Sequence, residues 1–222
     1  MFTATQAEAA QAEQKSDTLT QYYALRSLVV DFKGLEDTSE SEGKLAALKA
    51  SKAWKSALQH EERDIDLQDS LVATASGELA QLASADQGAQ VSLGHHITSV
   101  LADLRRRAHS NSSDSAICSR AFTQLFIQGM EAGQDEFRNN RLASAAVYFE
   151  LMAEGVPDQA WPLVMLAETR VRAGNKKAAL KALEEASHRG MKHPEALAQD
   201  PELQPLLSDP TFQRIVQGAG TK

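Results

Sequence analysis

The chain has 222 residues, of which 42% are hydrophobic and 24% charged, and its formal net charge at pH 7 is -7. This composition is that of an ordinary globular protein. The acidic balance argues against nucleic acid as a partner, because binding to phosphates depends on clustered Lys and Arg. No apolar run approaches the roughly 18 residues that a membrane-spanning helix needs, so we expect no membrane span.

Cysteine usage and the N-terminal segment bear on the compartment. The single cysteine, Cys118, cannot form a disulfide within the chain, so nothing requires an oxidising environment. Residues 1–15 lack the basic patch and apolar stretch of a secretory leader. We expect a cytoplasmic protein by default, and a periplasmic or secreted one if a leader has been removed from the sequence.

Residue composition and capping residues predict the first elements of the chain. Residues 1–16 are rich in Ala, Gln and Glu, which predicts a disordered or loosely helical segment. Asp17 is a suitable cap for a helix that runs to about Lys33, where Gly34 supplies the stop. The apolar face of this helix needs a partner.

A long helix is expected next. The stretch from Ser39 to Glu42 has the pattern of a capping box. Leu58, Ile65, Val72 and Leu79 then recur every seven residues, which predicts a helix of roughly 40 residues with a narrow coiled-coil-like seam. We interpret it as an arm packed on one side.

A third helix follows a loop at 84–89. Its apolar stripe includes Ile97, Leu101 and Leu104, and its end carries Arg105 to Arg107, cations that complement the negative end of the helix dipole. Residues 17–110 are therefore predicted to form a helical hairpin or three-helix bundle with a long helical arm. The polar turn at 111–115 is the predicted boundary to a second domain, 114–218.

Two segments of the second domain, 126–159 and 160–193, align with each other at a spacing of about 34 residues, the period of a stacked helix-turn-helix array. Large apolar, small and charged positions recur in the same order. The aligned pairs are Phe137 with Val171, Ala145 with Ala179, Phe149 with Leu183, and Glu150 with Glu184.

These segments resemble the tetratricopeptide repeat (TPR) family over about two repeats, residues 126–193. That pattern wants a small residue in each helix of a repeat, and Gly133 and Ala167 fill the first of these positions. Gly174 resembles the family's turn between helices, whereas Asn140 and Arg141 replace it in the first segment; Asn tolerates the left-handed backbone that such a turn needs. Pro157 falls at the closing proline of the family.

The resemblance implies a right-handed array of helix-turn-helix units, which needs a cap over its last apolar face. Asp200-Pro201 and Asp209-Pro210 each pair a cap residue with proline at the first helical position. We expect them to open two short capping helices. The predicted fold class is therefore all-α throughout.

No catalytic chemistry is predicted. The chain has no phosphate-binding glycine loop, nucleophile elbow or paired cysteines. His60 and Asp64 lie one helical turn apart but lack a third ligand for zinc. We therefore expect a protein that is not an enzyme and holds no metal or cofactor.

In the TPR family the first helices of successive repeats line a concave groove. The resemblance implies a scaffold or adaptor that binds a protein or peptide there, an apolar or helical segment in preference to an acidic terminus, or that self-associates. Four alternatives stay open: the two segments are generic helical hairpins with no repeat relationship and no groove, the chain's own N-terminal helices cover the groove, the chain is the C-terminal accessory region of a larger bacterial enzyme, or a cleft binds a small ligand. The predicted partner-binding residues are Ile127, Met130, Gln134, Phe137, Arg138, Trp161, Val164, Glu168, Val171 and Arg172.

Overall fold

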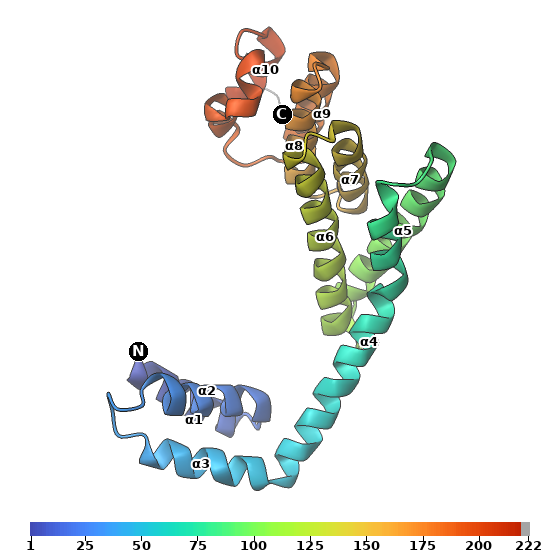
Figure 1. Cartoon of the computed structure of the whole chain (residues 1–222). Helices are drawn as coiled ribbons and strands as arrows, with labels where there is room; N and C mark the ends of the chain where they lie inside the picture. Colours follow the sequence, from blue (N-terminus) through green and yellow to red (C-terminus); the bar gives the residue numbers. More distant parts are fainter. Residues whose placement is uncertain (219–222) are drawn as a thin grey trace. The chain divides into compact units, whose positions relative to one another are not determined.

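The structure is a computed structural model that describes residues 1–218, and within them every regular element is a helix (Figure 1). The all-α prediction is confirmed. None of these helices is both long and apolar enough to cross a membrane. The elements are α1 (Phe2–Gln14), α2 (Thr18–Asp31), α3 (Ser39–Ala50), α4 (Lys52–Leu82), α5 (Gln87–Ala108), α6 (Ser115–Arg138), α7 (Leu142–Gly155), α8 (Trp161–Arg172), α9 (Lys176–His188), η1 (Pro194–Gln199), η2 (Pro201–Leu206) and α10 (Pro210–Val216).

The chain divides into two compact units, and the division falls inside α4. The first unit is Met1–Leu67 and the second begins at Gln68. The predicted boundary at 111–115 instead joins two packed helices of the second unit, α5 and α6. Leu101 of α5 and Ala121 of α6 are both fully buried in one core, so the polar turn between these helices separates no domains.

In the first unit, α2 packs against both α1 and α3 around a small apolar cluster. The segment expected to be disordered or loosely helical forms α1, which buries Ala9 and Ala12. The ring of Phe2 meets Phe32 edge-on at 5.1 Å. Asp17 caps α2 as expected, accepting a hydrogen bond from the Thr20 amide at 3.1 Å.

The predicted 40-residue helix is two helices. Ser51 has an extended backbone between α3 and α4, and its hydroxyl accepts from the Trp54 amide at 3.0 Å, which starts α4 afresh. The N-cap position of α3 is Thr38, one residue before the predicted position, and its side chain makes no capping hydrogen bond. The Thr38 hydroxyl instead donates to the Glu42 carboxylate at 3.2 Å, so the predicted capping box at Ser39 is not formed.

The seven-residue seam of α4 is buried over only half its length. Val72 and Leu79, in the second unit, are buried, whereas Leu58 and Ile65, in the first, are exposed. Five carboxylates lie between positions 61 and 69. Burying so many charges is unfavourable, and the packed seam begins only after this stretch.

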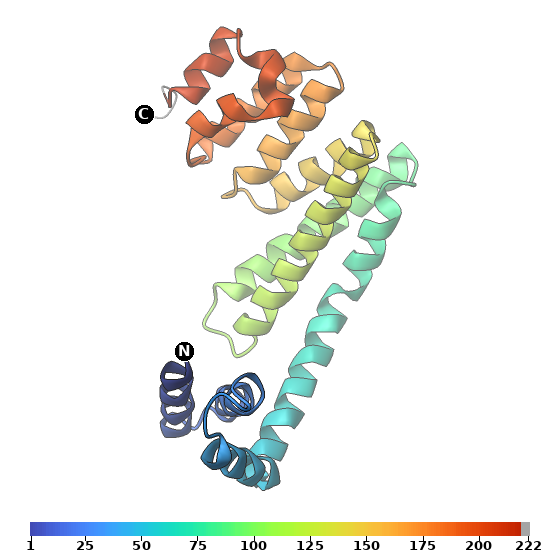
Figure 2. The ribbon, with the colours of Figure 1, turned by 60° about the vertical axis from the view of Figure 1, so that its left-hand side comes forward.

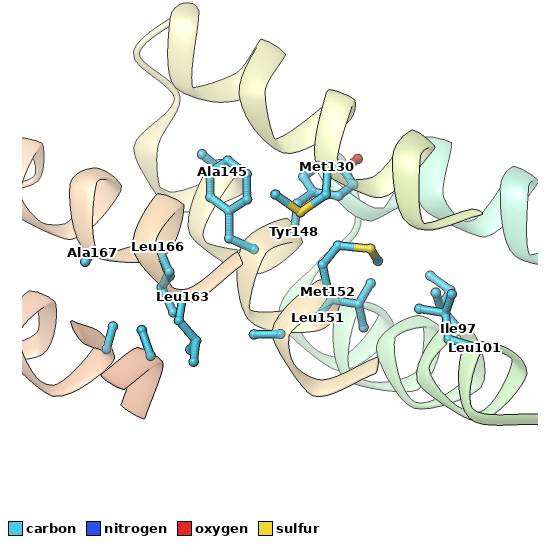
Figure 3. Packing of buried hydrophobic residues seen from close by; sticks show 14 of the residues in the cluster. Ile97, Leu101, Met130, Ala145, Tyr148, Leu151, Met152, Leu163, Leu166 and Ala167 are labelled. Atoms are coloured by element: carbon cyan, nitrogen blue, oxygen red, sulfur yellow. The ribbon is translucent and has the colours of Figure 1, made fainter. Parts of the chain in front are cut away.

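In the second unit, α6, α7, α8 and α9 pack consecutively as neighbours, and α5 packs against α6 and α7 (Figure 1). One apolar core runs through them (Figure 3). α4 joins this core through Val72 and Leu79, and the Tyr148 hydroxyl of α7 donates to the Leu79 carbonyl at 2.7 Å. This bond satisfies a carbonyl near the end of α4 that would otherwise be buried without a partner.

The helix pairs α6–α7 and α8–α9 share the same burial, turn conformation and turn hydrogen bond at positions 34 residues apart. Ala145 and Ala179 are both fully buried, as their small size predicts. Both turns contain a residue in the left-handed region, Asn140 at φ +58° and Gly174 at φ +78°. The turns also share a hydrogen bond at the same register: Arg141 N–H to Glu136 C=O, and Asn175 N–H to Arg170 C=O, each 2.8 Å.

The segment after α9 covers the end of the array as predicted. η2 packs against α8, and α10 packs against α9 (Figure 2). Leu203 and Phe212 are fully buried there. The carboxylates of Asp200 and Asp209 accept hydrogen bonds from the amides of Glu202 and Thr211, at 2.8 and 2.7 Å, and so cap η2 and α10.

Candidate functional site

The structure brings the two predicted rows of partner-binding residues near each other at two points, through side-chain contacts between α6 and α8. At one end the rings of Phe126 and Trp161 are 6.5 Å apart, edge to face. At the other end the guanidinium of Arg172 lies 4.8 Å from the centre of the Phe137 ring. The first helices of the two pairs therefore meet through long side chains at the two ends of α8, while each packs more closely on α7.

Not all of the predicted residues are accessible. Met130 and Val171 are buried, and Met130 belongs to the core together with Ala145 and Tyr148 (Figure 3). Phe137 is half-buried beneath Arg172. These three residues contribute to the packing of the array rather than to its surface.

The remaining predicted residues reach the surface to different degrees. Ile127 and Trp161, which occupy equivalent positions 34 residues apart, are 47% and 45% exposed. Large apolar residues with this exposure are unusual when they cluster. The other accessible members are Gln134, Val164 and Glu168, which are half-buried, and Arg138 and Arg172, which are exposed.

The C-terminal half of α8 is covered by the chain's own capping segment. Arg172 lies 3.9 Å from the Glu202 carboxylate, and the carboxyl of Glu168 interacts with Asp200 and Glu202 of the same segment. Burial, and then the proximity of Asp200 and Glu202, raise the pKa of Glu168 to about 8. This half of the predicted groove is therefore occupied by η2.

Within the second unit, the helices that precede α6 cover the surface of α6 only in part. Gln68 and Ser76 of α4 each make a 2.8 Å hydrogen bond to α6, with Gln124 and Gln128 respectively. These bonds attach α4 to one side of α6. They leave Ile127 exposed.

The accessible part is an apolar surface formed by α6 and the start of α8, which we call the aromatic surface. The rings of Phe122 and Phe126 are nearly parallel, with centres 6.3 Å apart, and Phe126 contacts Trp161. Ile127 and Val164 complete the set. Phe122 and Phe126 were not among the predicted partner-binding residues, because the helical period alone does not show which flank of α6 stays uncovered.

The aromatic surface leads into a pocket of about 530 Å³, which we call the Trp161 pocket. It lies between the start of α8 and the segment from the end of α9 to η1. No partner-binding residue was predicted in that segment, although the apolar Met191 between Gly190 and Lys192 was a usable signal. The lining residues are Asp158, Gln159, Ala160, Trp161, Val164, Arg189, Gly190, Met191, Lys192, His193, Ala196 and Leu197.

The arginine run at the end of α5 is neutralised within the second unit. Arg105 pairs with Asp158 at 2.8 Å, Arg106 pairs with Asp103, and Arg107 pairs with Asp114. Hydrogen bonds from Ser112 and Arg107 lower the pKa of Asp114 to about 2. These pairs support a structural role for the run, as its place at a helix end predicts.

Two kinds of reactive group were considered within residues 1–218: metal-binding clusters and the cysteine thiol. Nowhere in this range do three His, Cys, Asp or Glu side chains converge to hold a metal ion. Cys118 is buried, and burial raises the pKa of its thiol, which lowers its reactivity. The accessible chemistry of the site is apolar contact with charged groups at its edge.

In comparisons with protein-family models, with curated proteins and with solved structures, nothing matches the chain. The resemblance to TPR proteins therefore rests on the two 34-residue segments and on the equivalent positions described above.

Proposed function

We propose that this chain is a non-catalytic scaffold or adaptor of the TPR type, which binds an apolar, helical segment of a partner protein on the aromatic surface. The observation that carries the proposal is the exposure of Ile127 and Trp161 at equivalent positions of adjacent helices, with Phe122 and Phe126 beside them.

Half-exposed Trp and Ile leave apolar area in solvent, and covering it stabilises a complex by about 25 cal/mol per Å². Aromatic anchors next to pockets are the residues that most often dominate binding energy. A partner helix with apolar residues at i, i+3 or i+4 and i+7 presents the matching stripe. One of its side chains would enter the Trp161 pocket.

Competing occupants are less well supported. η2 already covers the C-terminal half of α8, which restricts a ligand to the aromatic surface and the pocket. Among the residues of the aromatic surface, none is charged. An apolar segment therefore fits this surface better than a polar one.

The test is selection of ligands by the intact chain from a display library of random 16-residue peptides. We expect enrichment of peptides with bulky apolar residues at helical spacing. Trp161→Ala should weaken the binding of a selected peptide by at least about 10-fold in titration calorimetry, as expected for a buried aromatic anchor.

The matched control is Val91→Ser, because Val91 is an exposed apolar residue of α5 outside the aromatic surface. It should leave binding unchanged. Failure to select any peptide, or equal loss in both variants, would refute the proposal. Enrichment of sequences that copy this chain's own helices would identify a second copy as the partner.

A further inference from the structure

The Trp161 pocket combines an apolar wall with a set of charged groups, most of which are already paired. The apolar part includes Trp161, Val164, Met191 and Leu197. Its volume of about 530 Å³ is ample for one bulky side chain. Shape and apolar area alone would accept many side chains, so selectivity depends on the charges.

Three of the four titratable groups that line the pocket have partners in the structure. Asp158 pairs with Arg105 at 2.8 Å, and His193 lies 3.1 Å from the Glu195 carboxylate. Arg189 pairs with Glu185 at 2.9 Å and donates to the Ala153 carbonyl at 2.5 Å. Because these side chains already have partners, they are less available to bind a charged group of a ligand.

Lys192 is the exception. It lines the pocket and is exposed, and no carboxylate among residues 1–218 lies within ion-pair distance of its ammonium group. The two arginines at this site, Arg105 and Arg189, each face a carboxylate. Among the described residues that line the pocket, Lys192 is thus the lysine or arginine without an ion-pair partner.

The start of α8 adds to this positive potential. Ala160 occupies the cap position without a side-chain cap; Pro162 has no N–H, and the amides of Leu163 and Val164 donate to the Ala160 carbonyl. The N-terminal end of a helix carries partial positive charge, which favours an anion nearby. Ala160 and Trp161 both line the pocket, so this end of α8 lies at the same site as Lys192.

We infer that the Trp161 pocket selects a bulky apolar side chain with an Asp or Glu next to it in the partner segment, and that Lys192 binds this carboxylate. The inference rests on the proposed function, because it specifies which segment the aromatic surface binds. An acidic residue near the anchor fixes the direction in which the segment lies on α6 and α8, since Lys192 lies at the pocket beside the start of α8.

The test uses the same random peptide library with wild type and Lys192→Glu. From the wild type we expect enrichment of Asp or Glu within one helical turn of the apolar anchor. From the variant we expect Lys or Arg at that position. An acidic peptide selected by the wild type should bind Lys192→Glu about 5-fold more weakly, the upper range for an exposed ion pair.

The control is Lys177→Glu, which makes the same charge change on α9 at a lysine that does not line the pocket. It should not alter the selected sequences. Raising the salt concentration should remove the difference between wild type and Lys192→Glu, because screening weakens exposed pairs.

The outcomes separate the two proposals. If selected peptides depend on Trp161 but show no acidic residue, or if Lys192→Glu selects the same sequences as wild type, the carboxylate inference is refuted and the proposed function stands. If no peptide is selected, or binding is independent of Trp161, both are refuted.

Discussion

The helix pairs α6–α7 and α8–α9 solve the same packing problem with different residues. Where α6 crosses α7, Gly133 faces the ring of Phe149; the equivalent positions in α8–α9 hold Ala167 and Leu183. All four are buried. A larger residue on one helix is matched by a smaller one on the other, so the pairs preserve the summed volume at the crossing rather than the residue type.

The largest expected effect comes from disturbing this match. A Cβ added at Gly133 would lie 2.7 Å from the Phe149 ring, too close for an ordinary contact, and Phe149 is fully buried and cannot easily move. Gly133→Ala should lower the free energy of unfolding by about 2 kcal/mol. Adding Phe149→Leu recreates the α8–α9 combination, and the double variant should lose at least about 1 kcal/mol less than the sum of the two single losses.

Urea unfolding followed by circular dichroism measures these differences. The control is Gly77→Ala in α4, where an added Cβ meets nothing within 4 Å. It should raise stability by about 0.5–1 kcal/mol through helix propensity alone. Additive losses at Gly133 and Phe149 would show that the two positions do not compensate each other.

The next difference is between Gln134 of α6 and Glu168 of α8, which are equivalent positions 34 residues apart. Burial, Asp200 and Glu202 raise the pKa of Glu168 from 4.5 to about 8. The folded protein therefore binds this proton more tightly than the unfolded chain, and the stabilisation is fully present below about pH 4.5. Stability should fall as the pH rises towards 8 and then level off.

Glu168→Gln makes the second pair resemble the first and removes this pH dependence. Between pH 5 and pH 8.5 we expect wild type to lose about 1–2 kcal/mol more than Glu168→Gln, measured by urea unfolding at each pH. Glu131→Gln, at an exposed position of α6, should follow the wild-type profile. Parallel profiles for wild type and Glu168→Gln would contradict the prediction.

The smallest effect concerns the two turns. Both require a left-handed residue, which is Asn140 in the first turn and Gly174 in the second. Gly174→Ala should cost about 1 kcal/mol, and Gly174→Asn less, because Asn adopts this conformation more readily than Ala. Asn140→Gly should change stability by only a few tenths of a kcal/mol. Thermal unfolding compares the three variants, and equal losses for Ala and Asn at position 174 would exclude a backbone origin.

Much of the helical array was predictable because its signals are local. Asn140 and Gly174 mark their turns through backbone preference, and Ala145 and Ala179 mark helix crossings through their size. Asp200 and Asp209 mark caps by chemistry that depends on the next few residues. The break at Ser51 was missed, because the seven-residue apolar pattern begins only after it and helical propensity is high on both sides.

The candidate site was predicted less completely, since it depends on contacts between distant segments. Position within a repeat placed Ile127 and Trp161 on the accessible face, but it did the same for Met130 and Val171, which are buried. The proximity of Glu168 to Asp200 and the pocket residue Lys192 both arise from how the segment after α9 folds back. No local pattern in that segment encodes these contacts.

The distribution of tryptophan gives each unit its own spectroscopic reporter. The chain has two tryptophans: Trp54 stacks on Tyr22 in the first unit with ring centres 4.2 Å apart, and Trp161 lies half-exposed beside its pocket in the second. With Trp54 replaced by Phe, all indole emission would come from the pocket wall. Entry of an apolar side chain would then shift that emission to shorter wavelength, so the protein supplies an optical signal for occupancy without any attached dye.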